Sequence, residues 1–194
     1  EMLRDKPKPQ TRTEKNDELE KLYDELAELN KQDKYVEMVE CAKKIIKLKP
    51  DDKYAWLRRG NGLTGLDNND EAIECFDKAL EIDPNEPDVW NSKGVAVDRL
   101  QNHEESIKCF DKAIELGSKN ISKLHYNIRY CWVNKGIAFR KLGRYEEAIK
   151  CHDKAIEIDP KWDWAWFNKG TTVKRLGKLE EAVKYYDKAI EIDP

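Results

Sequence analysis

Five cysteines and three histidines are the side chains of this 194-residue chain that could bind a metal or act as nucleophiles. No Cys-x-x-Cys pair occurs, and the adjacent residues Cys151 and His152 would point in different directions on a helix. Packed helices lie about 8–10 Å apart, whereas a disulfide needs Cα atoms about 4.4–6.8 Å apart. We therefore predict that the thiols are buried packing residues, and their odd number favours a reducing, cytoplasmic location.

A glycine-rich segment, Gly60 to Gly65, matches the G-x-G-x-x-G pattern of phosphate-binding loops. The phosphate-binding version follows a strand, whereas here the flanking residues predict a helix, so we expect no nucleotide site. Three glycines in one helix cost about 0.5–1 kcal/mol each, and we expect this helix to be the softest part of the chain. No nucleophile–base pair or metal-ligand set is evident, which predicts a protein that is not an enzyme and needs no cofactor or metal.

An internal repeat of 34 residues determines where all these residues stand. The phrase D-K-A-I-E-I-D-P ends at Pro160 and again at Pro194, and a close variant ends at Pro84. The tryptophans that keep the same register are Trp56, Trp90, Trp132 and Trp166. The resulting units are 19–52, 53–86, 87–120, 129–162 and 163–194, with an insertion at 121–128 between the third and fourth.

Glycine recurs at the eighth position of these units, and a bulky residue recurs in each second half. The glycines are Gly60, Gly94, Gly136 and Gly170, and the bulky residues are Phe76, Phe110, His152 and Tyr186. This pattern resembles the tetratricopeptide repeat family over about nine tenths of the chain. The resemblance implies an all-α, right-handed α-solenoid of about five helix–turn–helix units. It also implies a non-catalytic scaffold that binds a protein segment in a concave groove.

Composition limits the other classes of function. Charged residues make up 39% of the chain, and the net charge of −3 does not suit a protein that binds nucleic acid through bulk charge. No apolar run approaches the roughly 20 residues of a membrane helix. We expect a flexible arm at 1–16 and the repeat array at 17–194. Helical spacing in the insertion predicts that the fourth unit begins with an extended helix starting near Ser122.

The family resemblance also assigns the groove to certain positions of each first helix. The predicted groove residues are Tyr54, Leu57, Arg58, Asn61, Asn91, Ser92, Tyr130, Asn134, Ile137, Trp164, Phe167, Asn168 and Thr171. Aromatic rings there could anchor a peptide, and the amides of Asn134 and Asn168 could pair with its backbone. An alternative interpretation is that Tyr130 and Trp164 only pack between repeats. The basic residues at the seventh position, which are Arg59, Lys93, Lys135 and Lys169, are expected on the groove side as a solvated face.

Three hypotheses about the partner follow from the resemblance. The carboxylate clamp by which co-chaperone repeats hold acidic C-terminal tails is absent, since only Asn134 matches its pattern. A protein or peptide segment in the groove is the first hypothesis. The second is a homo-oligomer in which the uncapped last repeat stacks on the first repeat of another copy. The third is that the array recruits substrates for a larger protein.

Overall fold

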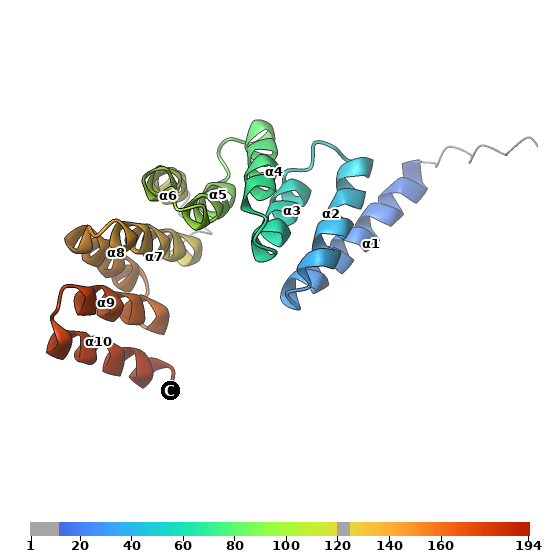
Figure 1. The fold of residues 1–194 in the computed structure, drawn as a ribbon. Coiled ribbons are helices and arrows are strands. Elements are labelled where there is room, and N and C mark those ends of the chain that lie inside the picture. Colours follow the sequence, from blue (N-terminus) through green and yellow to red (C-terminus); the bar gives the residue numbers. More distant parts are fainter. Residues whose placement is uncertain (1–11, 120–124) are drawn as a thin grey trace, which may run out of the picture.

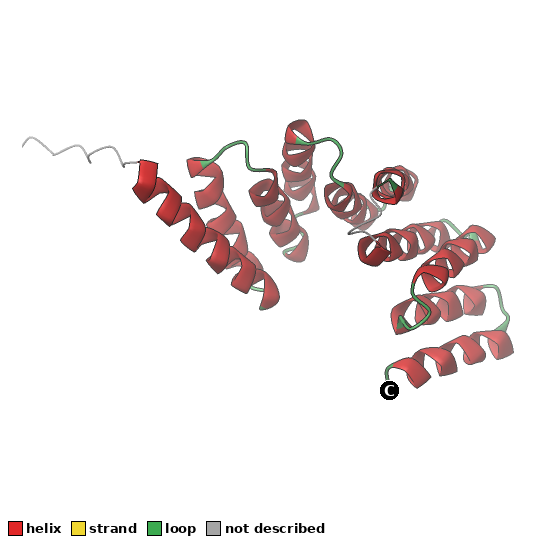
Figure 2. Ribbon diagram, turned by 180° about the vertical axis from the view of Figure 1, so that it is seen from behind, coloured by secondary structure: helices red, strands yellow, loops and turns green. Residues whose placement is uncertain are grey.

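The computed structural model describes residues 12–119 and 125–194, and these two ranges contain helices and turns without any strand (Figure 2). The helices are α1 (Arg12–Lys31), α2 (Tyr35–Leu48), α3 (Lys53–Gly65), α4 (Asn69–Ile82), α5 (Pro87–Arg99), α6 (His103–Ser118), α7 (His125–Lys141), α8 (Tyr145–Ile158), α9 (Asp163–Arg175) and α10 (Leu179–Ile192). Consecutive helices pair as α1–α2, α3–α4 and so on. The expected all-α solenoid of helix pairs is therefore confirmed.

The pairs follow one another along an arc, which Figure 1 shows from the blue N-terminal helices to the red C-terminal ones. Helix α3 contacts α5, α5 contacts α7, and α7 contacts α9. Within the described ranges, no even-numbered helix contacts another even-numbered helix. Helices α3, α5, α7 and α9 therefore line the inner side of the arc, and α4, α6 and α8 lie outside (Figure 1).

The four helix pairs from α3–α4 to α9–α10 are each held by a ring that lies against a glycine of the partner helix. A Cβ atom at Gly60 would lie 2.5 Å from the ring of Phe76, and one at Gly94 would lie 2.6 Å from that of Phe110. Both phenylalanines are buried. Because the missing side chain leaves room for a large ring, the two helices approach closely and bury apolar surface, as the repeat pattern predicted.

The turn inside each pair has one residue in the left-handed conformation, always at the fifteenth position of the unit. In the last two units this residue is Gly143 or Gly177, with φ of 77° and 81°. In the first three units it is Asp33, Asp67 or Gln101, with φ between 52° and 64°. A side chain makes this conformation costly, so the first three turns carry strain that glycine removes from the last two.

The glycines of α3 serve packing as well as flexibility. A Cβ atom at Gly62 would lie 2.8 Å from Val39, and one at Gly65 would lie 2.6 Å from the ring of Tyr35. Helix α3 therefore lies very close to α2. No strand precedes it in the described chain, so its glycine pattern does not form a phosphate-binding loop.

Helix α7 begins early, at His125, whereas α3, α5 and α9 begin at or next to the first position of their units. The extended helix expected in the fourth unit is thus present, and the expected start near Ser122 lies outside the described residues. Helix α1 also begins earlier than we expected, because Arg12 to Asn16 are helical and not part of an arm. Glu14 in its first turn faces the positive end of the helix dipole, which favours this start. Residues 1–11 lie outside the described chain.

Candidate functional site

A polar hollow of about 200 Å³ lies on the inner side of the arc, between α3, α5 and α7. Its lining residues are Leu57, Arg58, Asn61, Asp88, Asn91, Ser92 and Tyr130. Six of these seven residues belong to the predicted groove, so the columns of the repeat place them together. Asp88 was missing from the prediction, although it stands at the same repeat position as Tyr54 and Tyr130.

Side-chain amides give the hollow a fixed pattern of donors and acceptors. Asn134 on α7 donates from Nδ2 to Oδ1 of Asn91 on α5, over 3.2 Å. Arg58 donates from Nη1 to Oδ1 of Asn30 on α1, over 3.4 Å. These two contacts join α7 to α5 and α3 to α1, and the remaining donors of the Asn91 and Asn134 amides can bind backbone carbonyls.

Exposed aromatic rings lie on the inner helices beside this hollow and beyond it. Trp164 and Phe167 on α9 are 45% and 44% exposed, and their rings stack with centroids 5.5 Å apart. Tyr54 on α3 is also exposed, and the ammonium of Lys53 lies 5.1 Å from its ring. Rings of this size are rarely left in solvent in such pairs without a partner, which makes them candidate anchors.

Tyr130 has a different environment from the other aromatic residues. Its ring lies edge-on to Trp162, with centroids 4.6 Å apart, and the guanidinium of Arg129 lies over both rings. Arg129 also pairs with Asp159. Packing within the fourth unit therefore accounts for one side of Tyr130, while its other side lines the hollow. Trp164, in contrast, is exposed.

Asn168 does not present its side chain as expected, whereas Thr171 and Ile137 are half-buried. Asn168 is only 2% exposed, and its Nδ2 donates to the carbonyl of Trp164 over 2.8 Å. Thr171 donates its hydroxyl to the carbonyl of Phe167 over 3.0 Å. Ile137 packs against the core of the fourth unit. Because its amide folds back onto its own helix, Asn168 cannot hold a partner's backbone in this conformation, and the expected pair of amides with Asn134 is wrong.

The lysines at the seventh position do not form the solvated face that we expected. Lys93 pairs with Asp77 at 2.6 Å, and Lys169 pairs with Asp153 at 2.6 Å. Each pair joins the first helix of one unit to the second helix of the unit before it. We call these contacts, together with Lys135–Asp111, the junction pairs. They stabilise the stacking of units and leave these lysines little freedom to bind an acidic partner.

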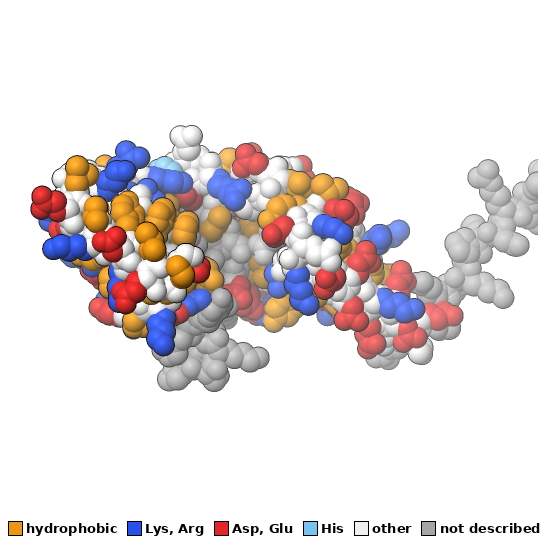
Figure 3. All heavy atoms as spheres, turned by 90° about the horizontal axis from the view of Figure 1, so that it is seen from below, with side chains coloured by type: hydrophobic (Ala, Val, Ile, Leu, Met, Phe, Trp, Pro, Cys, Tyr) orange, Lys and Arg blue, Asp and Glu red, His pale blue; other side chains and the backbone are white. Residues whose placement is uncertain are grey.

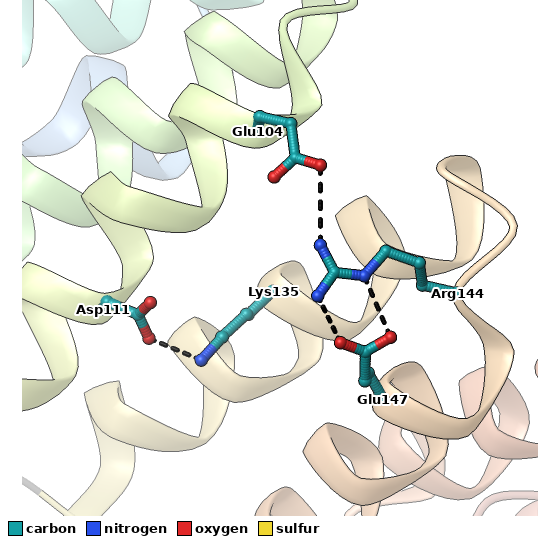
Figure 4. Close-up of polar contacts among 5 residues, drawn as sticks. All are labelled: Glu104, Asp111, Lys135, Arg144 and Glu147. Carbon is teal, nitrogen blue, oxygen red and sulfur yellow. Dashed lines mark hydrogen bonds and ion pairs between the residues drawn. The ribbon is translucent and has the colours of Figure 1, made fainter.

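The junction between the third and fourth units has ion pairs of Arg144 in addition to its junction pair, as Figure 4 shows. Lys135 on α7 reaches Asp111 on α6 over 2.5 Å. Arg144, just before α8, lies between Glu104 of α6, at 3.4 Å, and Glu147 of α8. These contacts hold the two units together although eight extra residues separate them in the sequence.

The thiols that could act as nucleophiles or metal ligands are buried. All five cysteines are buried and none forms a disulfide within the described residues, and burial raises the pKa of Cys109 and Cys151 to about 11 and that of Cys131 to about 12. Such thiols are protonated and poorly nucleophilic at neutral pH. In the described ranges, no group of three or more His, Cys, Asp and Glu side chains is arranged to hold a metal.

His152 occupies the position of the packing rings Phe76 and Phe110 and is fully buried. Burial, together with the nearby cations Arg140 and Lys169, lowers its pKa to about 3. Its Nε2 lies 3.2 Å from the hydroxyl of Thr172, and among the described residues its Nδ1 has no hydrogen-bond partner. His152 is therefore a neutral packing residue and not a general base.

None of the described helices combines the length and the apolar character needed to cross a membrane.

Comparison with solved structures shows the same fold in proteins of low sequence identity. A MamA crystal structure is 22% identical, with a TM-score of 0.69 over 90% of this chain and 91% of that one. A MamA from Desulfovibrio magneticus RS-1 is 16% identical, with a TM-score of 0.73 over 91% and 96%. PilW, described as a widely conserved type IV pilus biogenesis factor, is 24% identical, with a TM-score of 0.76 over 89% and 78%.

No curated protein sequence matches the chain. Models of the tetratricopeptide repeat match it at four places, which are residues 54–86, 87–120, 130–161 and 164–194. These matches include most of the chain and have the same register as the glycine and tryptophan columns. The chain belongs to the tetratricopeptide repeat family.

Proposed function

We propose that this protein is a non-catalytic scaffold that binds a segment of another protein along the inner side of its arc. The observation that supports this proposal is the hollow between α3, α5 and α7, with exposed aromatic rings on the same series of inner helices. The buried thiols and the buried, neutral His152 are poorly suited to catalysis. Five cysteines without a disulfide among the described residues also suit a reducing compartment, from which we infer a cytoplasmic location.

The two parts of the inner surface would recognise different parts of the segment. The hollow presents Arg58 and the amides of Asn61 and Asn91, which suit a polar side chain or an extended backbone. The stacked rings of Trp164 and Phe167, which are about half exposed, suit an apolar side chain that would cover them. A ligand with a polar portion and an apolar anchor would satisfy both parts.

Two double variants separate these contributions. Trp164→Ala with Phe167→Ala removes the aromatic anchor, and Asn91→Ala with Asn134→Ala removes the amide pair of the hollow. Trp164 and Phe167 are exposed, so their loss should change stability little. Lys108→Ala on α6 is a matched control, because this lysine is exposed on an outer helix.

Each variant would be immobilised and used to capture proteins from a lysate of the source organism, with quantification by mass spectrometry. We expect a protein that the unchanged chain and the Lys108→Ala control retain, and that both groove variants lose by tenfold or more. Peptides tiled across that protein would then define the bound segment. Capture of the same proteins in equal amounts by all four baits would refute groove binding.

A further inference from the structure

Successive inner helices contact each other near their C-terminal ends through a cation and an acceptor. At the junction of α3 and α5, Arg99 donates from Nη1 to the carbonyl of Thr64 over 2.7 Å. At the junction of α5 and α7, Lys141 pairs with Asp98 at 2.6 Å. Both contacts join the twelfth position of one unit to the thirteenth position of the next. The repeat thus predicts the same kind of contact between α7 and α9.

Two arginines occupy these positions between α7 and α9, which contact each other. Arg140 stands at the twelfth position of the fourth unit, and Arg175 stands at the thirteenth position of the fifth. Burial and the positive charge of Arg175 lower the pKa of Arg140, as expected for two guanidinium groups that lie close together. A second cation therefore stands where the other two junctions have an acceptor.

The guanidinium of Arg140 forms no hydrogen bond or ion pair with a described residue. Its side chain is half-buried, and its Nε is buried without a hydrogen-bond partner in the described chain. Two other arginines with a buried Nε have compensating contacts, since Arg129 pairs with Asp159. The guanidinium of Arg59 lies 5.6 Å from the ring centroid of Trp56. A buried N–H group without an acceptor is costly, so the environment of Arg140 favours an added acceptor.

The carboxylate that lies near these arginines is already bound elsewhere. Asp98 on α5 raises the pKa of Arg140, but its two oxygens bind Lys141 at 2.6 Å and His103 at 2.7 Å. The negative ends of the helix dipoles favour cations in the last turns of α7 and α9, but they do not favour burying one guanidinium beside another. A carboxylate or phosphate between the two arginines would balance their charges and accept their hydrogen bonds.

The arginine pair lies at a defined distance from the aromatic anchor of the inner surface. Arg175 follows Trp164 by eleven residues, which is about three turns, so both residues are on the same side of α9. This interval corresponds to about 16 Å along the helix axis. An extended chain rises about 3.3 Å per residue and needs at least about five residues to cover that distance. In Figure 3, Lys and Arg side chains border the hydrophobic side chains of the C-terminal units, at the left.

We propose that Arg140 and Arg175 bind an acidic group, either a carboxylate or a phosphorylated side chain, of the protein segment that the array holds. This inference rests on the proposed function and adds a chemical requirement to it. The acidic residue stands at least about five positions from the apolar side chain that covers Trp164 and Phe167. Because a guanidinium group binds an anion in a preferred geometry, the pair fixes the register of the segment.

Inorganic phosphate and acetate test the anion site on the whole chain, at pH 7 and constant ionic strength. The signals of the arginine Nε–H groups are followed by NMR. We expect the Arg140 and Arg175 signals to shift along a saturating curve, with a dissociation constant of about 1–10 mM for the better anion. Arg175→Gln should weaken binding at Arg140 at least tenfold. The control Lys108→Gln removes the same charge from an outer helix and should leave binding unchanged.

Tighter binding of phosphate would favour a phosphorylated side chain, and tighter binding of acetate a carboxylate. A circular dichroism melt in chloride checks that Arg175→Gln stays folded, and removal of a like charge should not lower its melting temperature. A linear shift without saturation for both anions would overturn the proposal. Equal binding by Arg175→Gln and the unchanged chain would also overturn it.

The capture experiment separates this inference from the proposed function when Arg175→Gln is added as a bait. We expect this variant to lose the captured protein by about tenfold. If the variant of Trp164 and Phe167 loses that protein and Arg175→Gln keeps it, groove binding stands and this inference is overturned. If only Arg175→Gln loses it, the arginine pair is a binding site and the proposed groove function fails.

Discussion

His152→Phe is the substitution whose effect the structure defines most fully. His152 takes the place that Phe76 and Phe110 take in the two preceding units, against a glycine of the paired helix. A phenyl ring removes a buried nitrogen that lacks a partner among the described residues, and it leaves the Thr172 hydroxyl bonded to the carbonyl of Asn168. Since an unsatisfied buried polar atom costs about 1–3 kcal/mol, we expect the variant to be more stable at pH 7 by about 1 kcal/mol.

The larger effect of this substitution is on the pH dependence of stability. The pKa of His152 is about 3 in the folded chain and near its ordinary value of 6.5 in the unfolded chain. Between these values the unfolded chain binds the extra proton, so this residue makes the free energy of unfolding fall as the pH decreases below 6.5. Over the 1.5 units from pH 6.5 to 5 the loss is about 2 kcal/mol, at about 1.4 kcal/mol per unit.

The assay is urea unfolding of both proteins at pH 7 and pH 5, followed by tryptophan fluorescence. The carboxylates titrate alike in both, so their contribution cancels in the comparison. We expect the advantage of the phenylalanine variant to grow by about 2 kcal/mol at pH 5, seen as a larger shift in midpoint at unchanged slope. An equal pH dependence of the two proteins would refute the reasoning, because His152 would then be protonated in the folded state.

Three further substitutions test the packing, the turns and the junctions by urea unfolding. Gly60→Ala places a Cβ atom 2.5 Å from the ring of Phe76, and should lower the free energy of unfolding by about 1–3 kcal/mol. Gln101→Gly relieves a left-handed residue with φ of 64°, and should raise it by about 1 kcal/mol. Lys135→Ala removes the pair with Asp111, and should lower it by about 0.5–1 kcal/mol. Changes of opposite sign would contradict each interpretation.

The sequence was sufficient to predict the helix pairs and the contacts inside them. Gly94 and Phe110 recur at fixed positions, and the contact between a glycine and a ring depends only on the spacing within one unit. The hollow was predictable for the same reason, because Asn61 and Asn91 stand at related positions of successive inner helices. Periodicity therefore determines which residues share a face.

Side-chain orientation and contacts between units were harder to predict. Asn168 and Asn134 stand at the same repeat position, yet one folds onto its own helix and the other reaches α5. That choice depends on local rotamers, which the repeat pattern does not contain. The junction pairs did leave a signal, because Lys93 follows Asp77 by 16 residues and Lys169 follows Asp153 by the same interval. A constant interval between opposite charges indicates a contact between neighbouring units.

Each repeat unit contacts only its neighbours, and the junction pairs mean that neighbouring units are held together by two kinds of interface, ionic and apolar. In the first junction, Arg59 and Lys43 occupy the two positions of a junction pair, and the glycines of α3 let it lie close to α2. Each of the next three junctions contains an ion pair at these positions. Added salt weakens the ionic couplings by screening and leaves the apolar one almost unchanged. Ionic strength therefore acts unevenly along the chain. At high salt, the C-terminal units should therefore unfold before the N-terminal ones.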